Sequence, residues 1–181
     1  MRFPVQLVKM LNENGINTNP AKLIARTGWT TDNLSQGIKN AGLTEAFNLI
    51  TLLIGVNNQY QGRDMTEYRL QFRKLLDTAI ELAGNNESKV IVISIPYYGV
   101  TPFAKYSDTE KIASKIDIFN KINLEETVLR KANYVAITYI SRLAKIETSL
   151  IAAEGLHPSG EMYRLWVENI FPIAKRIFNN Q

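Results

Sequence analysis

The sequence predicts an α/β protein in which a parallel sheet has helices on both faces. Apolar runs of strand length alternate with amphipathic segments of helical period along the whole chain. Two of the runs, 47–55 and 89–96, are almost continuously apolar, as expected of strands that are covered on both sides. A loop and a longer helical segment follow each of them, which is the repeating unit of such a sheet.

The helices are predicted from apolar periodicity and from residues that start or stop a helix. Pro4 suits a first helical turn and Gly15 a stop, while Gly42 ends the second helix. In the last helix, Pro172 is expected to produce a kink. The expected helices are 4–14, 30–41, 64–83, 108–131 and 160–178.

The predicted strands direct attention to one edge of the sheet. Ligands of open α/β sheets bind outside the carboxyl ends of the strands, here the segments "RTGW", "GVNNQY", "SIPYYG" and the region after "YVAITYI". No internal repeat or linker interrupts the pattern, so we expect one domain over residues 1–181. The expected strands are 22–26, 47–55, 89–96 and 134–140.

Composition excludes several kinds of chemistry. The 181 residues contain no cysteine and one histidine, which excludes disulfides, thiolate zinc sites, a cysteine nucleophile and a histidine-rich metal centre. A site for Mg²⁺ or Ca²⁺ made only of carboxylates stays open, but no EF-hand or P-loop spacing occurs. We therefore expect no metal.

Charge and hydropathy argue against nucleic acid and membrane as partners. The net charge of +4 comes from basic residues scattered among acidic ones, as in "RDMTEYRLQFRK", without a basic cluster. No apolar run has membrane-spanning length. The start, "MRFPVQLVKML", continues an amphipathic helix and is not a signal peptide. The default expectation is a cytoplasmic protein.

Four residues, two after predicted strands and two before the last helix, are candidates for chemistry. Gly28 follows a strand, where its N–H can approach a ligand closely or simply serve a turn. Asn57 offers an amide donor beyond the strand 47–55, or caps a helix. Glu154 and His157 are spaced so that the carboxylate can orient the imidazole as a general base. Alternatively, His157 binds a backbone carbonyl and Glu154 faces water, or the histidine has no catalytic part.

Together these residues resemble the SGNH hydrolases, the superfamily of GDSL-type esterases and lipases. The segments "LLIGVNNQYQGRD" and "GLHPSGEMYRLWV" are especially similar to bacterial members. The resemblance implies a three-layer, flavodoxin-like sheet and hydrolysis of a small-molecule ester without a cofactor. It also implies that the Gly28 N–H and the Asn57 side chain form an oxyanion hole, that His157 is the base and that Glu154 orients it.

The chain departs from this family at two points. The carboxylate is glutamate in place of the usual aspartate, which adds one bond of about 1.5 Å. The strand that ends in Gly-Asp-Ser and supplies the nucleophile is absent, and none of three serines is a credible substitute: Ser35 and Ser94 fall inside a helix and a strand, and Ser159 begins a helix.

The absent strand would normally lie between 22–26 and 47–55. We therefore expect an SGNH-type sheet without its first strand, in a chain that is incomplete at its N-terminus by truncation rather than by nature. An export signal could have been lost with that segment. The open sheet edge could accept another chain or form a homo-oligomer.

The predicted function is that of a serine esterase or acyl-ester hydrolase, with this chain inactive for lack of its serine. The alternative is a catalytically inactive SGNH-like protein that binds a carbohydrate or an ester. A nucleotide-binding flavodoxin-like protein is disfavoured because no glycine-rich phosphate loop follows a strand. Four aromatic residues in one loop line an acyl or sugar pocket or simply pack that loop: Tyr97, Tyr98, Phe103 and Tyr106.

Overall fold

The computed structural model describes residues 2–180, which fall into two compact units. The first unit contains the chain up to Lys22, Pro96–Lys115 and the chain from Ala136 onward. The second contains Leu23–Ile95 and Ile116–Val135. Each unit is therefore assembled from segments that are far apart in the sequence.

The second unit is built on a parallel sheet of three strands. Strands β1 (Ile50–Leu52), β2 (Val90–Ile93) and β3 (Asn133–Val135) lie in the order β1-β2-β3. Ile50 is in register with Val90, and Ile91 with Asn133. Every residue of β2 is fully buried, which explains the continuous apolar run in the sequence. The predicted α/β class and the parallel sheet are confirmed.

Helices α2 (Thr31–Ala41), α3 (Val56–Tyr60) and α4 (Met65–Leu82) belong to the same unit, as does most of α5 (Thr109–Leu129). Asp64 caps the start of α4, because its carboxylate accepts the N–H groups of Thr66 and Glu67. Its buried face packs against β1 and reaches α5, where the Tyr68 and Phe119 rings lie 4.4 Å apart between centroids. That face consists of Tyr68, Phe72, Leu75, Leu76 and Ala79.

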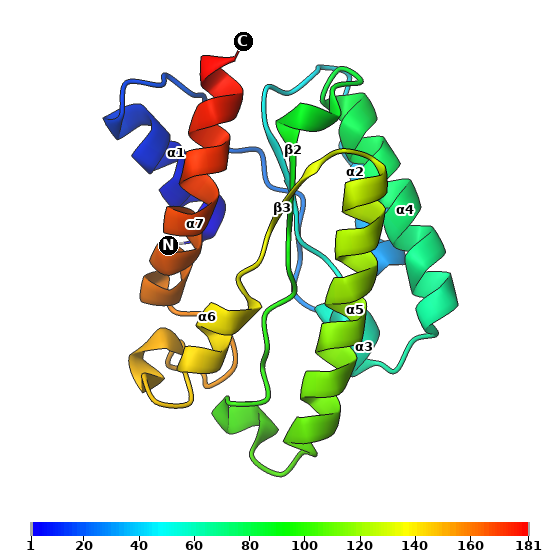
Figure 1. Cartoon of the computed structure of the whole chain (residues 1–181), viewed down its shortest axis with the longest axis vertical. Helices are drawn as coiled ribbons and strands as arrows, with labels where there is room; N and C mark the ends of the chain where they lie inside the picture. Colours follow the sequence, from blue (N-terminus) through cyan, green and yellow to red (C-terminus); the bar gives the residue numbers. More distant parts are fainter. Residues whose placement is uncertain (1, 181) are drawn as a thin grey trace. The chain divides into compact units, whose positions relative to one another are not determined.

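In the first unit, the two ends of the chain pack together. Helix α1 (Phe3–Glu13) lies beside α7 (Gly160–Asn179) (Figure 1). The Phe3 ring contacts Tyr163 and Trp166, and the Gln6 amide donates to the carbonyl oxygen of Gly160. The unit also contains helix α6 (Thr138–Leu143) and the 3₁₀ turns η2 (Pro102–Ala104) and η3 (Thr148–Leu150). The turn η1 (Glu87–Lys89) belongs to the second unit.

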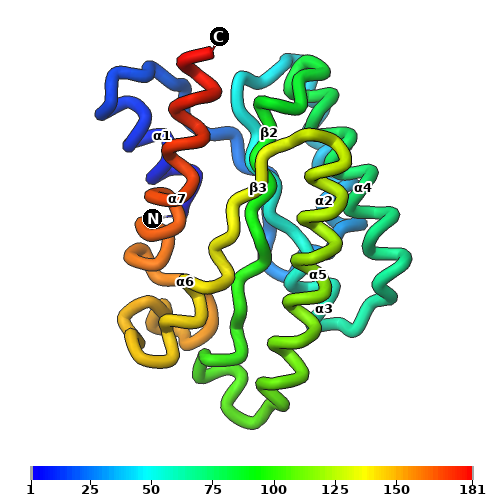
Figure 2. Tube along the Cα trace, viewed as in Figure 1, coloured from blue at the N-terminus to red at the C-terminus, as the bar shows by residue number. Residues whose placement is uncertain are grey.

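The predicted strand 22–26 is wrong, because this segment forms neither strand nor helix. Figure 2 traces it in blue between α1 and α2. A strand needs a neighbour to accept and donate its backbone hydrogen bonds, and within residues 2–180 no strand pairs with this segment. The Leu23 side chain is 43% exposed. The apolar residues of this segment are therefore not buried as a strand in the sheet would be.

The predicted strand 134–140 is half wrong, because β3 stops at Val135 and α6 begins at Thr138. The last bond between β2 and β3 runs from the Ser94 N–H to the carbonyl oxygen of Val135. Beyond it, the N–H and the carbonyl oxygen of Ile95 both bind the side chain of Asn120. Pro96 follows and has no N–H. Beyond Val135, the segment 134–140 therefore has no neighbouring strand to pair with. It forms the start of α6 instead.

The other predicted elements are confirmed with shifted boundaries. The strands are shorter than the apolar runs 47–55 and 89–96, whereas the helix ends agree within one or two residues. Pro172 lies inside α7, which is continuous to Asn179; the kink and the single domain remain predictions. In the part of the chain that the structure describes, no helix combines the length and the apolar character needed to cross a bilayer.

Candidate active site

His157 and Glu154 lie on a closed loop that leads into α7. The loop is fixed by an antiparallel bridge between Ile151 and Pro158 and by a bond of 2.8 Å from the Ala152 N–H to the carbonyl oxygen of His157. Gly155 has φ +83°, a conformation that favours glycine. This backbone folds the loop back so that Glu154 faces the residue three positions later.

The predicted contact between the two side chains is present. One oxygen of Glu154 lies 2.5 Å from Nδ1 of His157. The same carboxylate accepts the N–H of Leu156 at 2.8 Å and that of His157 at 2.9 Å. These two backbone donors, followed by the imidazole, hold the pKa of Glu154 below its ordinary value. Glu154 is therefore charged at neutral pH and can only accept hydrogen bonds.

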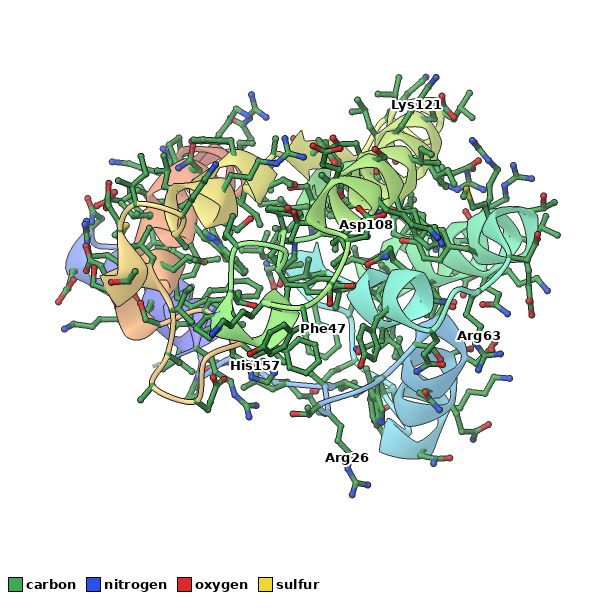
Figure 3. The ribbon with its side chains drawn as sticks, turned by 90° about the horizontal axis from the view of Figure 1, so that it is seen from below. Arg26, Phe47, Arg63, Asp108, Lys121 and His157 are labelled. Atoms are coloured by element: carbon green, nitrogen blue, oxygen red, sulfur yellow. The ribbon has the colours of Figure 1, made fainter. Side chains whose placement is uncertain are left out.

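Since the carboxylate has no proton to donate, Nδ1 of His157 must carry the hydrogen. The neutral ring then has its lone pair on Nε2, the nitrogen that a general base uses. Both side chains are about half exposed, so this lone pair is not shut inside the core. Figure 3 labels His157 on this loop.

A second loop supports the Glu154–His157 loop from the side. The long segment between β2 and α5, green in Figure 2, carries η2. The Phe103 N–H donates to the carbonyl oxygen of Gly155 at 3.1 Å. Pro102 packs so closely that a methyl group added at Gly155 would lie 3.3 Å from its Cβ. Sequence reasoning missed this support, since backbone contacts between distant loops leave no signal in residue type.

Gly28 and Asn57, both in the second unit, are brought together. Gly28 has φ +85° in the turn before α2, and Asn57 lies in the first turn of α3, the next element after β1. The Asn57 amide nitrogen donates to the carbonyl oxygen of Trp29, the residue after Gly28, at 3.0 Å. An amide nitrogen has two hydrogens, so this bond orients the group and uses one of them.

Asn58 is a positioning residue that the sequence analysis did not identify. It is 2% exposed, its oxygen accepts the Thr31 N–H at 3.1 Å, and its nitrogen donates to the Thr31 hydroxyl at 2.7 Å. These two bonds join the start of α3 to the start of α2. They therefore hold Asn57 beside the Gly28 turn. In the sequence, the only indication of this role was that Asn58 directly follows Asn57.

The three serines considered as nucleophiles occupy structural positions. Ser94 is 1% exposed beyond the end of β2, and Ser35 lies within α2. The Ser159 hydroxyl caps α7 by accepting the Met162 N–H at 3.2 Å. Across residues 2–180, no group of three or more histidine, aspartate or glutamate side chains is arranged to hold a metal ion.

The parallel sheet and the helices beside it define an α/β protein. The sequence profile of the GDSL-like Lipase/Acylhydrolase family matches residues 2–165, and the chain belongs to this family. The resemblance to the SGNH hydrolases is thereby confirmed. No curated protein matches the chain by sequence.

Solved structures share the fold at low sequence identity. The chain is similar to the crystal structure of TesA, with 15% identity and a TM-score of 0.73 over 97% of this chain and 88% of that one. It is also similar to the lipase/acylhydrolase from Enterococcus faecalis, with 19% identity and a TM-score of 0.66 over 96% and 83% of the two chains. For Axe2-W215I, an acetyl xylan esterase from Geobacillus stearothermophilus, the identity is 14% and the TM-score 0.70 over 96% and 81%.

Proposed function

We propose that this chain forms the body of a serine-type acyl-ester hydrolase, and that Gly28, Asn57, Glu154 and His157 act together at the carboxyl ends of the strands. The observation that carries the proposal is the 2.5 Å contact between Glu154 and Nδ1 of His157, which leaves Nε2 as a proton acceptor. Family membership supplies the reaction class, because the family is described as one of lipases and acylhydrolases.

In the proposed reaction, Nε2 of His157 takes the proton of a serine hydroxyl as the serine oxygen attacks the ester carbonyl. Glu154 keeps the ring in the required tautomer and stabilises the imidazolium that forms. His157 then gives the proton to the leaving alcohol, and the acyl group remains on the serine. Water, activated by the same histidine, hydrolyses the acyl-enzyme and releases the acid.

The oxyanion of the tetrahedral intermediate is assigned to two donors of the second unit. One is the Gly28 N–H, which has no Cβ beside it, and the other is the Asn57 amide. The bond from Asn57 to the carbonyl oxygen of Trp29 supports this role, because it fixes the direction of the amide before substrate arrives. Loss of one such donor lowers kcat by about 10²–10³-fold in a comparable enzyme.

The nucleophilic serine is proposed to lie on a strand that pairs with the free edge of β1. Within residues 2–180, β1 pairs with β2 on one side and with no other strand. Two of its three residues are only half-buried, although the neighbouring β2 is buried throughout. A parallel strand on this edge would end near the Gly28 turn and α3. The same edge would accept a second copy of the chain.

The test compares ester hydrolysis by the 181-residue chain with that by a version carrying an added strand ending in Gly-Asp-Ser. With p-nitrophenyl acetate or butyrate, we expect turnover only from the extended protein, and His157→Ala should abolish it. The control is the extended protein with Gly-Asp-Ala. The proposal would be contradicted if the 181-residue chain itself hydrolysed the ester and His157→Ala in that chain abolished the turnover. Another nucleophile would then be responsible.

The second candidate function is ester or carbohydrate binding without catalysis. It is favoured by the absence of Gly-Asp-Ser from the 181 residues. An extended protein that folds and binds substrate but shows no turnover would support this function over hydrolysis.

A further inference from the structure

An open groove of about 710 Å³ lies wholly within the first unit. One wall comes from the loop 99–105, and the other comes from the segment 144–155, which leads to the Glu154–His157 loop. The groove and that loop share the backbone of Ala152, Ala153 and Gly155. Six of the fourteen lining residues are glycine or alanine, which leaves room for a ligand: Gly99, Ala104, Ala144, Ala152, Ala153 and Gly155.

The charged residues that line the groove are all of one sign. Lys105 and Lys145 contribute to the lining, one from each wall, and no aspartate or glutamate does. Among residues 2–180 neither ammonium group has a carboxylate partner; Lys105 lies 5.3 Å from the centroid of the Tyr106 ring. Three threonines add hydroxyl groups: Thr101, Thr109 and Thr148.

A mainly apolar groove with two cations that have no carboxylate partner among residues 2–180 is complementary to a short organic anion. Pro102, Val100 and Ile151 offer apolar contact for a short carbon chain. The ammonium groups offer charge-assisted hydrogen bonds to a carboxylate. A long neutral acyl chain would use the walls but leave both charges unused.

We propose that this groove binds small carboxylate-bearing compounds, and that Lys105 and Lys145 select esters that carry a free carboxylate, such as half-esters of short dicarboxylic acids. The binding site stands on the groove alone. Its use as a substrate subsite rests on the proposed function, through the backbone that it shares with the Glu154–His157 loop.

The test measures binding to the 181-residue chain and does not depend on turnover. Monomethyl succinate is titrated at low salt, and amide shifts are followed by NMR, with dimethyl succinate as the uncharged counterpart. We expect saturable shifts at Thr101, Ala152 and Gly155 with the monoester only. Lys105→Gln and Lys145→Gln should each raise Kd by about two- to fivefold, the effect of one exposed charge pair. Added salt should weaken binding.

The control variant is Lys39→Gln, which removes an exposed lysine of α2, outside the groove. The proposal is overturned if the diester shifts the same amides equally, if Lys39→Gln raises Kd as much as the groove variants, or if no saturable shift occurs. An extended protein that hydrolyses esters without preferring the charged one would overturn the groove proposal while leaving the proposed function intact. If the extended protein bound the monoester but hydrolysed no ester, the proposed function would be overturned, while binding of the carboxylate in the groove would stand.

Discussion

At His157, the ring nitrogen near Glu154 faces an oxygen that already accepts a backbone N–H. That arrangement determines the tautomer without help from any distant residue. In the proposed function, Glu154 would take the place of the aspartate that is usual in SGNH hydrolases. The carboxylate of the longer side chain reaches the ring and two backbone donors at once.

The tautomer is the first prediction at this scale. In ¹⁵N NMR spectra, the neutral ring of His157 should be the Nδ1–H form. Glu154→Ala should leave a mixture of both forms, because no acceptor then favours Nδ1–H. The matched control is Glu147→Ala, an exposed residue of the same unit. As the chain has one histidine, the signal is unambiguous. An unchanged tautomer in Glu154→Ala would contradict the orienting role.

The pKa of Glu154 gives a second prediction. Backbone donors, first that of Leu156, lower it from the ordinary glutamate value of about 4.3. A depressed pKa in the folded state means that the carboxylate stabilises the loop above the unfolded pKa. This contribution is lost as the pH falls through the folded value. The ¹³C carboxyl signal of Glu154 should therefore titrate with a midpoint below the ordinary value, and a midpoint at or above it would refute the contacts.

Among the elements, α4 and α5 are joined by a cluster of charges defined by Arg69, Arg73, Arg130 and Glu126. The Glu126 side chain is fully buried and accepts from all three guanidinium groups. These bonds, that of Arg73 foremost, lower the pKa of Glu126. Its contribution to stability is therefore present at neutral pH and lost on acidification through the folded value.

Glu126→Gln should lower the free energy of unfolding by about 2–4 kcal/mol, because three cations lose their shared anion in a buried site. Glu125→Gln is the matched control, since that carboxylate is 39% exposed and pairs with Arg69; its cost should stay below about 1 kcal/mol. Urea denaturation near neutral pH measures both. Equal losses in the two variants would show that burial of Glu126 contributes nothing.

Helix α3 depends on Asn58 in a different way from Asn57. Asn58→Ala should cost about 1–3 kcal/mol of stability, because the Thr31 N–H loses its acceptor in a buried position. Asn57→Ala removes one half-exposed bond and should cost less, yet it should lower kcat in an active extended protein. If both variants have the same effect on stability and on turnover, the two asparagines do not have separate roles.

For the whole molecule, the prediction concerns the convergence of Asn57 and His157. The chain has no cysteine, so a single introduced thiol can carry a nitroxide label. A label at Tyr60→Cys, at the end of α3, should broaden the ring signals of His157. A label at Glu81→Cys, in the last turn of α4, should not, because α4 runs back toward the amino ends of the strands. If only the label at Glu81→Cys broadened the His157 ring signals, Asn57 and His157 would not share a site.

A structural feature can be predicted from the sequence when the residues that cause it are close together in the chain. Helix ends such as Ala41 before Gly42 follow from nearby residues and were predicted within one or two positions. The Glu154–His157 contact was also predictable, because a turn of three residues closes it. The bonds of Asn58 to Thr31 and of Phe103 to Gly155 join segments far apart in the sequence, and no local pattern indicates them.

The sequence by itself determined the α/β class, the five long helices and the pairing of Glu154 with His157, but not the short helices α3 and α6. Periodicity and turn chemistry act within a few residues, so they can be read from the chain. Only the tertiary structure decided which strand-like segments form strands and where each strand ends. The segment 22–26 has strand-like residues but no partner, and β3 ends at Val135 because Asn120 takes both backbone groups of Ile95. A strand is a relation between two segments, and its extent is set by the hydrogen bonds that a neighbour leaves free.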